Sequence, residues 1–443
     1  MTAALLALVP ILGLAQHGGM GGGGGGGGMT SGGSMSGPAS GSGMSNGMSH
    51  EMGTRMAPST GMSALRDARR MHAEALQQGH RDLLDFDPRG DLIVRNELVG
   101  IGATTQGLAV AQAAGFVIAR QSELEGLDAN VVVLMAPQGL SARKALKRLR
   151  ELDPDAVYDF NHLYFKGGTD AAAASEPASP SVGDGQKTLA RRVGLIDGGV
   201  EPGHAALRSL TLHTHGCNGT VVPSSHGTAI ASRLVVGFSD AMSTMISVDL
   251  YVADVYCDAP TGGSTDAVVQ ALAWLMQQDV PVINVSLAGP PSVLLQRASQ
   301  MALARGHLIV AAVGNDGPSA PPLYPAAYPG VVAVTAVDRA DKVLIEAGRG
   351  QFIAFAAPGA DIDAASLPSG YSPVRGTSFA APIVASRLAL RLERPDRAAA
   401  ERAVSELVTA AVDLGRPGRD SVYGNGCVGC ATRDVAVEAA RAR

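Results

Sequence analysis

The chain has 443 residues, of which 46% are hydrophobic, enough for two ordinary domains and a sizeable core. Its 35 basic and 40 acidic residues give a formal net charge of -5, and no basic block is long enough to form a phosphate-binding surface. The composition therefore excludes a chain that is disordered throughout, and it argues against nucleic acid as a partner.

Residues 1–15 contain the apolar run ALLALVPILGLA and end in small residues around Ala15. This pattern is typical of a secretory signal peptide, although no lysine or arginine precedes the run. The run is too short to cross a bilayer, and no other stretch approaches transmembrane length. We therefore expect an exported protein, periplasmic or extracellular, with no membrane span. The alternatives are a true start elsewhere or a tail without an address function.

Residues 16–63 are of low complexity, with an unbroken glycine run followed by glycine, serine and methionine. This composition buries too little apolar surface to offset the chain entropy, so we expect a disordered segment. Its methionines, together with His17 and His50, could capture Cu(I), but their spacing shows no fixed ligand geometry. We interpret the segment as a flexible spacer.

Helical spacing of apolar and charged residues begins at Ala64 and predicts a helical linker over residues 64–89. Residues 90–165 then show strand and helix patterns in the order β-α-β-β-α-β, with Ser141 as the N-cap of the second helix. This order predicts a small α+β domain of the ferredoxin-like class. Residues 166–187 are rich in Gly, Ala, Ser and Pro without a hydrophobic period, which indicates an exposed linker.

Residues 188–443 carry apolar runs that alternate with helical patterns. The runs are RRVGLID, VDLYVADV, VPVINVSL, HLIVAAVG and GVVAVTAV. Near-continuous apolar strands that alternate with helices predict an α/β domain with a mostly parallel sheet and helices on both faces. A functional site is expected at the carboxyl ends of such strands.

Three polar residues stand at strand ends or helix starts of this predicted sheet. Asp197 ends the first apolar run, His226 opens SHGTAIASRL, and Ser378 begins the helix in GTSFAAPIVA. A hydroxyl nucleophile, an imidazole that takes its proton and a carboxylate that orients the imidazole supply what acyl transfer needs. Each residue alone could equally be a turn former, a loop residue or a helix cap. Their order Asp, His, Ser on an α/β sheet favours catalysis.

The motifs around these residues resemble those of the subtilisin family of serine peptidases (peptidase S8). VGLIDGGV resembles the aspartate motif, HGTAIAS the histidine motif and GTSFAAP the serine motif. AAVGND is similar to the stretch whose asparagine helps form the oxyanion hole, and INVSLAGP to the strand that pairs with the substrate backbone. The resemblance covers residues 188 to about 428. It implies a subtilisin-like fold and a serine endopeptidase.

The resemblance also assigns roles to single residues. The catalytic residues would be Asp197, His226 and Ser378, and the oxyanion hole would consist of the Asn315 side chain and the Ser378 backbone amide. Pro382 should be tolerated because the amides of the first helical turn have no intrahelical partner.

The implied substrate-binding residues are Ser286, Leu287, Ala288, Gly289 and Leu323. Ala288 stands where many family members have glycine, and Leu323 stands where the floor of the primary pocket is often small. Both side chains would narrow the recess for the substrate side chain before the scissile bond. We therefore expect a preference for small or medium apolar residues there.

In the family, an N-terminal domain of the β-α-β-β-α-β plan templates folding, covers the active site and is cut away. The resemblance implies that residues 90–165 are such a prodomain, with FNHLYF in the substrate groove by strand addition. Maturation cleavage would fall within residues 165–187. A permanent second domain is the alternative. The expected protein is a secreted, autoprocessed zymogen and a monomer, and its partners are its own prodomain and protein or peptide substrates.

A metal site is conceivable at His213, His215 and Cys217, which form an H-x-H-x-C pattern. No fourth nearby ligand has metal-like spacing, so we expect no metal there and no cofactor for catalysis. The family often binds structural calcium, but no acidic loop locates a site.

The four cysteines are Cys217, Cys257, Cys427 and Cys430, an even number that suits two disulfides in an oxidising compartment. Three connectivities are possible. The spacing of the last two favours a local bridge or two free thiols over a redox pair, because no thioredoxin-like unit surrounds them.

Two other functions remain open. A non-catalytic binder could retain the fold, although the intact Asp, His, Ser and Asn argue against it. A sedolisin-type acid peptidase shares a GTS-like serine motif but uses glutamate as the base, whereas the HGT helix argues for activity at neutral pH.

Overall fold

The computed structural model describes residues 58–127, 129–170, 190–239 and 247–430. The predicted signal peptide, nearly all of the Gly/Ser/Met-rich segment and most of the predicted 166–187 linker lie outside the described residues. Helix α1, Pro58–Gly79, begins before the predicted start at Ala64. The short strand β1, Leu84–Phe86, was not predicted.

The N-terminal domain (residues 84–162) has the predicted order of elements. They are β2 Leu92–Ile101, α2 Thr105–Ala113, β3 Val117–Leu124, β4 Ala129–Met135, α3 Ala142–Leu152 and β5 Val157–His162. The strands form an antiparallel sheet in the order β5-β2-β4-β3, and β1 pairs with the start of β2. Ser141 is the N-cap of α3, as predicted, but its side chain makes no capping hydrogen bond.

The C-terminal domain (residues 190–430) is built on a seven-stranded parallel sheet with the order β15-β14-β13-β11-β8-β10-β9. Its strands are β8 Ala190–Asp197, β9 Leu210–His215, β10 Ser247–Asp254, β11 Val282–Val285, β13 Leu308–Ala312, β14 Val332–Val337 and β15 Ile353–Pro358. The five predicted runs correspond to β8, β10, β11, β13 and β14. The run VPVINVSL is not one strand, because the chain breaks at Ser286 and continues as β12, Leu287–Ala288.

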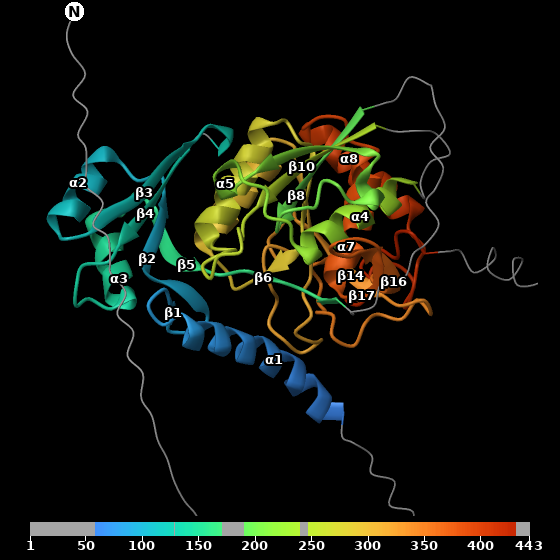
Figure 1. Cartoon of the computed structure of the whole chain (residues 1–443), viewed down its shortest axis with the longest axis horizontal. Helices are drawn as coiled ribbons and strands as arrows, with labels where there is room; N and C mark the ends of the chain where they lie inside the picture. The colour runs from blue at the N-terminus through green and yellow to red at the C-terminus, as the bar shows by residue number, and fades with distance from the viewer. Residues whose placement is uncertain (1–57, 128, 171–189, 240–246, 431–443) are drawn as a thin grey trace, which may run out of the picture. The chain divides into compact units, whose positions relative to one another are not determined.

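Helices cover both faces of this sheet, as Figure 1 shows. Helices α4, Ser225–Ser239, and α7, Thr377–Ala389, pack on one face in one apolar cluster. Helices α5, Thr265–Gln277, and α6, Val293–Ala304, pack on the other face in a second cluster. Both faces of the strands are therefore buried, which explains their near-continuous apolar sequences. The remaining elements are α8 Arg397–Ala410, β16 Ala360–Ala365 and β17 Tyr371–Arg375.

A short segment, residues 163–170, leaves the N-terminal domain and runs along the C-terminal domain. We call it the cleft segment, and we call the surface of the C-terminal domain along which it lies the cleft. Its strand β6, Phe165–Lys166, pairs antiparallel with β12, and its strand β7, Thr169–Asp170, pairs antiparallel with β17. The prediction that FNHLYF forms the groove strand was wrong in its first half. His162 is fully buried beside Asp87, so this half stays in β5 of the N-terminal sheet.

Polar side chains of the N-terminal domain lie at the starts of α5 and α6. Asp159 accepts a hydrogen bond from the Val293 amide (2.9 Å) at the start of α6. At the start of α5, Asp266 accepts from Asn161 (2.9 Å) and from Arg120 (3.0 Å). Because the first amides of a helix lack intrahelical partners, the Asp159 carboxylate stabilises the start of α6 and joins the two domains.

Candidate active site

Asp197 and His226 meet at the carboxyl end of β8. Asp197 is the last residue of that strand, and His226 lies in the first turn of α4; both side chains are buried. His226 Nδ1 lies 2.9 Å from each Asp197 carboxylate oxygen. The Gly198 amide donates to Asp197 Oδ1 (2.7 Å) and fixes the carboxylate. The carboxylate therefore orients the ring and leaves its Nε2 facing the cleft.

Ser378 lies at the start of α7, behind the N-cap residue Gly376. Its hydroxyl donates to the Ser286 carbonyl oxygen (3.2 Å), and its own carbonyl accepts from the Ser286 hydroxyl (3.0 Å). The second bond explains Pro382, which is four residues further along the helix and has no amide to give to the Ser378 carbonyl. The expectation that Pro382 belongs to the unpaired first turn was therefore wrong: the Ser286 hydroxyl replaces the missing helical bond.

The Asn315 side chain places a hydrogen-bond donor without a partner beside Ser378. Its Oδ1 accepts from the Thr377 amide (3.0 Å), which fixes the side-chain amide, whereas its buried Nδ2 has no hydrogen-bond partner among the described residues. A Cβ placed on Gly167 would lie 3.0 Å from both Asn315 Nδ2 and Ser378 Oγ. The donor and the hydroxyl thus face one point in the cleft. A buried donor without a partner suits a site where negative charge appears only during a reaction.

The five predicted substrate-binding residues lie along the same cleft. Leu287 and Ala288 pair with the cleft segment, and Gly289 forms a bridge with Tyr324. Leu323, which precedes Tyr324, packs on the backbone of Gly314: a Cβ on Gly314 would lie only 2.4 Å from Leu323 Cδ1. Ser286 anchors the serine as described above. The segment INVSLAGP therefore contains strand β12, which pairs with residues of the same chain.

Tyr256 is a cleft residue that the sequence analysis missed. Its hydroxyl donates to the Tyr164 carbonyl (2.9 Å), and the Lys166 ammonium lies 4.3 Å from the centre of its ring. Burial, and then the negative charge of Asp197, raise the pKa of Tyr256, so the hydroxyl stays protonated. Its place just beyond the carboxyl end of β10 was the available signal.

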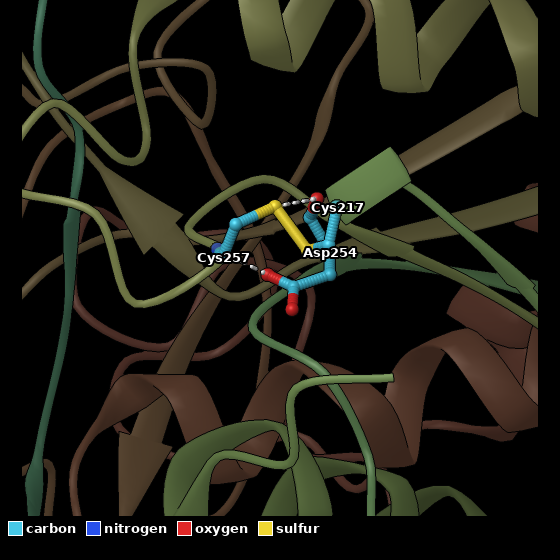
Figure 2. Close-up of side chains that lie close together, drawn as sticks. All are labelled: Cys217, Asp254 and Cys257. Carbon is cyan, nitrogen blue, oxygen red and sulfur yellow. Dashed lines mark hydrogen bonds between the residues drawn. A yellow bond between two sulfur atoms is a disulfide. The ribbon is translucent and has the colours of Figure 1, made fainter. Parts of the chain in front are cut away.

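A disulfide between Cys217 and Cys257 holds the loop that follows β10 (Figure 2). Asp254 accepts from the backbone amides of Tyr256 (2.9 Å) and Cys257 (3.0 Å), so the loop is fixed at two points. The two sulfurs and the Asp254 carboxylate lie close enough to share an ion, but the sulfurs are bonded to each other and cannot act as thiolates. The second disulfide is the local bridge between Cys427 and Cys430.

The H-x-H-x-C pattern has other partners. His213 stacks on Tyr251 with ring centres 4.3 Å apart, and His215 stacks on Trp274 at 4.7 Å. Burial lowers the pKa of His215. Because Cys217 is in a disulfide, these packing contacts account for all three residues.

Helix α1 also reaches the cleft, a contact that the sequence analysis missed by treating residues 64–89 as a linker. Arg69 donates to the Ala288 carbonyl (2.7 Å) and forms a 3.5 Å ion pair with Asp316, next to Asn315. Its guanidinium lies 5.3 Å from the centre of the Phe165 ring. Burial raises the pKa of Asp316. The pairing of β6 with β12 is therefore reinforced from outside by a helix.

Comparison with known proteins identifies the family. The sequence profile of the subtilase family matches residues 190–426, more than half of the chain. The chain belongs to the subtilase family. Subtilisin DY of Bacillus licheniformis is 31% identical over 247 residues, which cover 54% of this chain and 88% of that protein. Minor extracellular protease Epr of Bacillus subtilis (strain 168) is 28% identical over 314 residues, covering 65% of this chain and 47% of that protein.

A solved structure supports the fold. Fervidolysin from Fervidobacterium pennivorans, described as a keratinolytic enzyme related to subtilisin, aligns with a TM-score of 0.61 at 17% identity. The alignment covers 78% of this chain and 61% of fervidolysin. This subtilase is thus a serine endopeptidase with the predicted α/β fold. Within the residues that the structure describes, no helix has the length and apolar character needed to cross a membrane.

Proposed function

We propose that this subtilase is an exported endopeptidase that acts through Asp197, His226 and Ser378 and is made as an autoprocessed zymogen. One observation carries the proposal: His226 Nδ1 lies 2.9 Å from both Asp197 oxygens, beside a cleft where Ser378 Oγ and the unpartnered Asn315 Nδ2 face the same point.

The position of each group supports a role in catalysis. Ser378 Oγ attacks the substrate carbonyl carbon while His226 Nε2 takes the hydroxyl proton, and Asp197 stabilises the imidazolium that forms. Asn315 Nδ2 and the Ser378 amide at the start of α7 stabilise the oxyanion. His226 then gives the proton to the leaving amine, and water hydrolyses the acyl-enzyme by the same steps in reverse. The mechanism needs no cofactor, and we assign no calcium site.

The N-terminal domain has the role of a prodomain in this proposal. Strand β6 occupies the substrate strand β12, so a peptide substrate cannot pair there before the segment leaves. The His226 Nε2 atom lies 2.8 Å from the Gly167 carbonyl oxygen, so the chain also contacts the proposed base. Cleavage within residues 165–187 would separate the two domains and permit activation of a monomeric enzyme that acts on proteins or peptides.

Export is the remaining part of the proposal. Both disulfides suit an oxidising compartment, and residues 1–15 have the pattern of a signal peptide.

The proposal is tested by peptide hydrolysis together with a serine-directed phosphonate. Mature wild type should cleave a fluorogenic peptide near neutral pH and take up one phosphonate group at Ser378, whereas Ser378→Ala should do neither. A wild type that neither hydrolyses nor is labelled would be a binder that keeps the fold. An activity optimum near pH 4 would favour sedolisin-type chemistry instead.

A further inference from the structure

We propose that maturation cuts the Gly167–Gly168 bond, and that the mature site selects glycine on both sides of the bond it hydrolyses. The inference deepens the proposed function and rests on it. It names the scissile bond and the class of substrate: extended segments that contain Gly-Gly.

The register of the cleft segment identifies the bond. Strand β6 pairs with β12 on one side of the proposed catalytic serine, and strand β7 pairs with β17 on the other. Only Gly167 and Gly168 lie between these two strands. A Cβ on Gly167 would lie 3.0 Å from Ser378 Oγ, and one on Gly168 would lie 2.9 Å from the Arg375 carbonyl oxygen. The peptide bond midway between the two pairings is therefore the one beside the nucleophile.

A side chain at position 167 would be crowded by the reacting groups. Its Cβ would sit 3.0 Å from Asn315 Nδ2 and Ser378 Oγ, closer than ordinary van der Waals contact. The resemblance to the family places Leu323 at the floor of the recess for the substrate side chain, and the Leu323 side chain lies against the Gly314 backbone. In this arrangement a side chain on Gly167 would press on both reacting groups, so glycine fits best.

Gly168 is required for a different reason. Its φ of 104° lies in a region that strains residues with a Cβ. A Cβ there would also meet the buried Phe379 ring at 2.7 Å. Gly376 approaches from the other side, and its own Cβ would lie 2.8 Å from the Gly168 Cα. The backbones at Gly168 and Gly376 are therefore too close for a side chain on either residue.

The segment is held in an unreactive orientation. The Gly167 carbonyl oxygen lies beside His226 Nε2 (2.8 Å), while Asn315 Nδ2, the proposed oxyanion donor, stays unpartnered. Because a Cβ on Gly167 would lie 3.0 Å from Asn315 Nδ2, we expect rotation of the Gly167–Gly168 peptide unit to bring this oxygen within reach of that donor. Glycine on both sides makes such a rotation easier, because neither residue has a Cβ to restrict φ and ψ.

The step balances as an acyl transfer. Ser378 Oγ bonds to the Gly167 carbonyl carbon, the bond to the Gly168 nitrogen breaks, and that nitrogen takes the proton that His226 removed from Ser378. Water then attacks the acyl-enzyme, leaving a carboxylate on Gly167 and a new amino terminus at Gly168.

The processed terminus is the first test. N-terminal sequencing and intact mass of purified wild type should give Gly168 as the new first residue. Gly167→Ala and Gly168→Ala should each slow processing by roughly tenfold to a hundredfold, since small misplacements of reacting atoms cost that much. Gly79→Ala is the control: a Cβ there meets no atom within 4 Å, so processing should match that of wild type.

Selectivity of the mature enzyme is the second test. Wild type should cleave YFKGGT between its glycines and cleave YFKLGT at least about tenfold more slowly. Leu323→Gly should raise kcat/KM for YFKLGT by about tenfold, because it empties the recess, and Leu323→Met should not. Phosphonate labelling checks that each variant is folded.

The possible results distinguish a failure of this inference from a failure of the proposed function. If wild type takes up phosphonate but begins at another residue, or cleaves YFKLGT as fast as YFKGGT, the Gly-Gly inference is overturned and the serine peptidase stands. If wild type neither processes itself nor reacts with phosphonate, the proposed function fails as well.

Discussion

The two domains that meet at the cleft differ in how their sequences reveal their roles. In the C-terminal domain, side chains carry the proposed chemistry, and four short motifs place Asp197, His226, Asn315 and Ser378 around one cleft. The N-terminal domain contributes backbone pairing through its exit segment and polar side chains at two helix starts. Reactive side chains form motifs that can be identified in the sequence. Backbone contacts do not depend on residue type in this way, so they become visible only in the structure.

The two domains should also differ in the effect of single substitutions. Loss of a reacting group should remove the chemistry of the C-terminal domain almost entirely, because its groups act as a unit. The N-terminal domain binds through many partial contacts, so single changes there should have modest effects. The following predictions test that contrast.

The largest effect is expected for His226→Ala in the mature enzyme. Without the base, kcat should fall on the order of a million-fold, the loss known for the same change in a subtilisin. The measurement is hydrolysis of a fluorogenic peptide. His213→Ala is the control, because His213 stacks on the Tyr251 ring and has no part in the proposed mechanism. Equal losses in the two variants would contradict the assigned base.

Asn315→Ala should have the next largest effect. It removes the unpartnered Nδ2 donor, and kcat should fall roughly a hundred- to a thousandfold with little change in KM, as known for an oxyanion-hole asparagine of a subtilisin. The KM should hold because the oxyanion forms only in the reaction. A rise in KM at constant kcat would instead indicate a role in substrate binding.

A substitution of Asp87 should lower the free energy of unfolding of the N-terminal domain. Burial alone would raise its pKa, but hydrogen bonds from His162 and from the backbone amides of Asp91 and Arg89 outweigh burial and lower the pKa to about 2. A lowered pKa contributes stability above the ordinary value of 3.8, and this stability is lost as the pH falls through about 2. Asp87→Asn should therefore cost about 2 kcal/mol of unfolding free energy at pH 7.

The measurement is denaturant unfolding of the Ser378→Ala precursor with and without Asp87→Asn, at pH 7 and at pH 2–3. The two proteins should converge as the pH falls. Asp155→Asn, at an exposed position, is the control and should change nothing. A difference that persists unchanged at pH 2 would show that the carboxylate charge is not its cause.

The smallest effect is expected for Arg120→Ala at the boundary between the domains. Arg120 bridges Glu97 and Asp266, both nearly buried, but it is itself 47% exposed, so we expect about 1 kcal/mol. The processed but still associated complex should therefore show roughly fivefold more peptide hydrolysis. Lys144→Ala, on the exposed side of α3, should not change it. High salt should reduce the difference in hydrolysis between Arg120→Ala and wild type. If Arg120→Ala is inhibited as strongly as wild type, this ion-pair bridge does not hold the domains together.

The sequence predicted the elements whose residues carry a local pattern. Five of the seven sheet strands and the motif residues followed from periodicity and spacing, but both edge strands were missed. Strand β9, LTLHTH, alternates polar and apolar residues, and strand β15, IAFAAP, is a short run without flanking helical patterns that would mark it. Contacts between segments that are distant in the sequence were also missed. Nothing near Arg69 in the sequence indicates that it reaches the Ala288 carbonyl, and nothing near Leu163 shows that the chain leaves its sheet there.

The most direct test of the account is the intact mass of the purified precursor beside Ser378→Ala. Wild type should appear as two fragments divided within residues 165–187, and Ser378→Ala as one uncut chain. A mutant cut at the same bond and at the same rate as wild type would contradict the claim that this cleft processes its own chain.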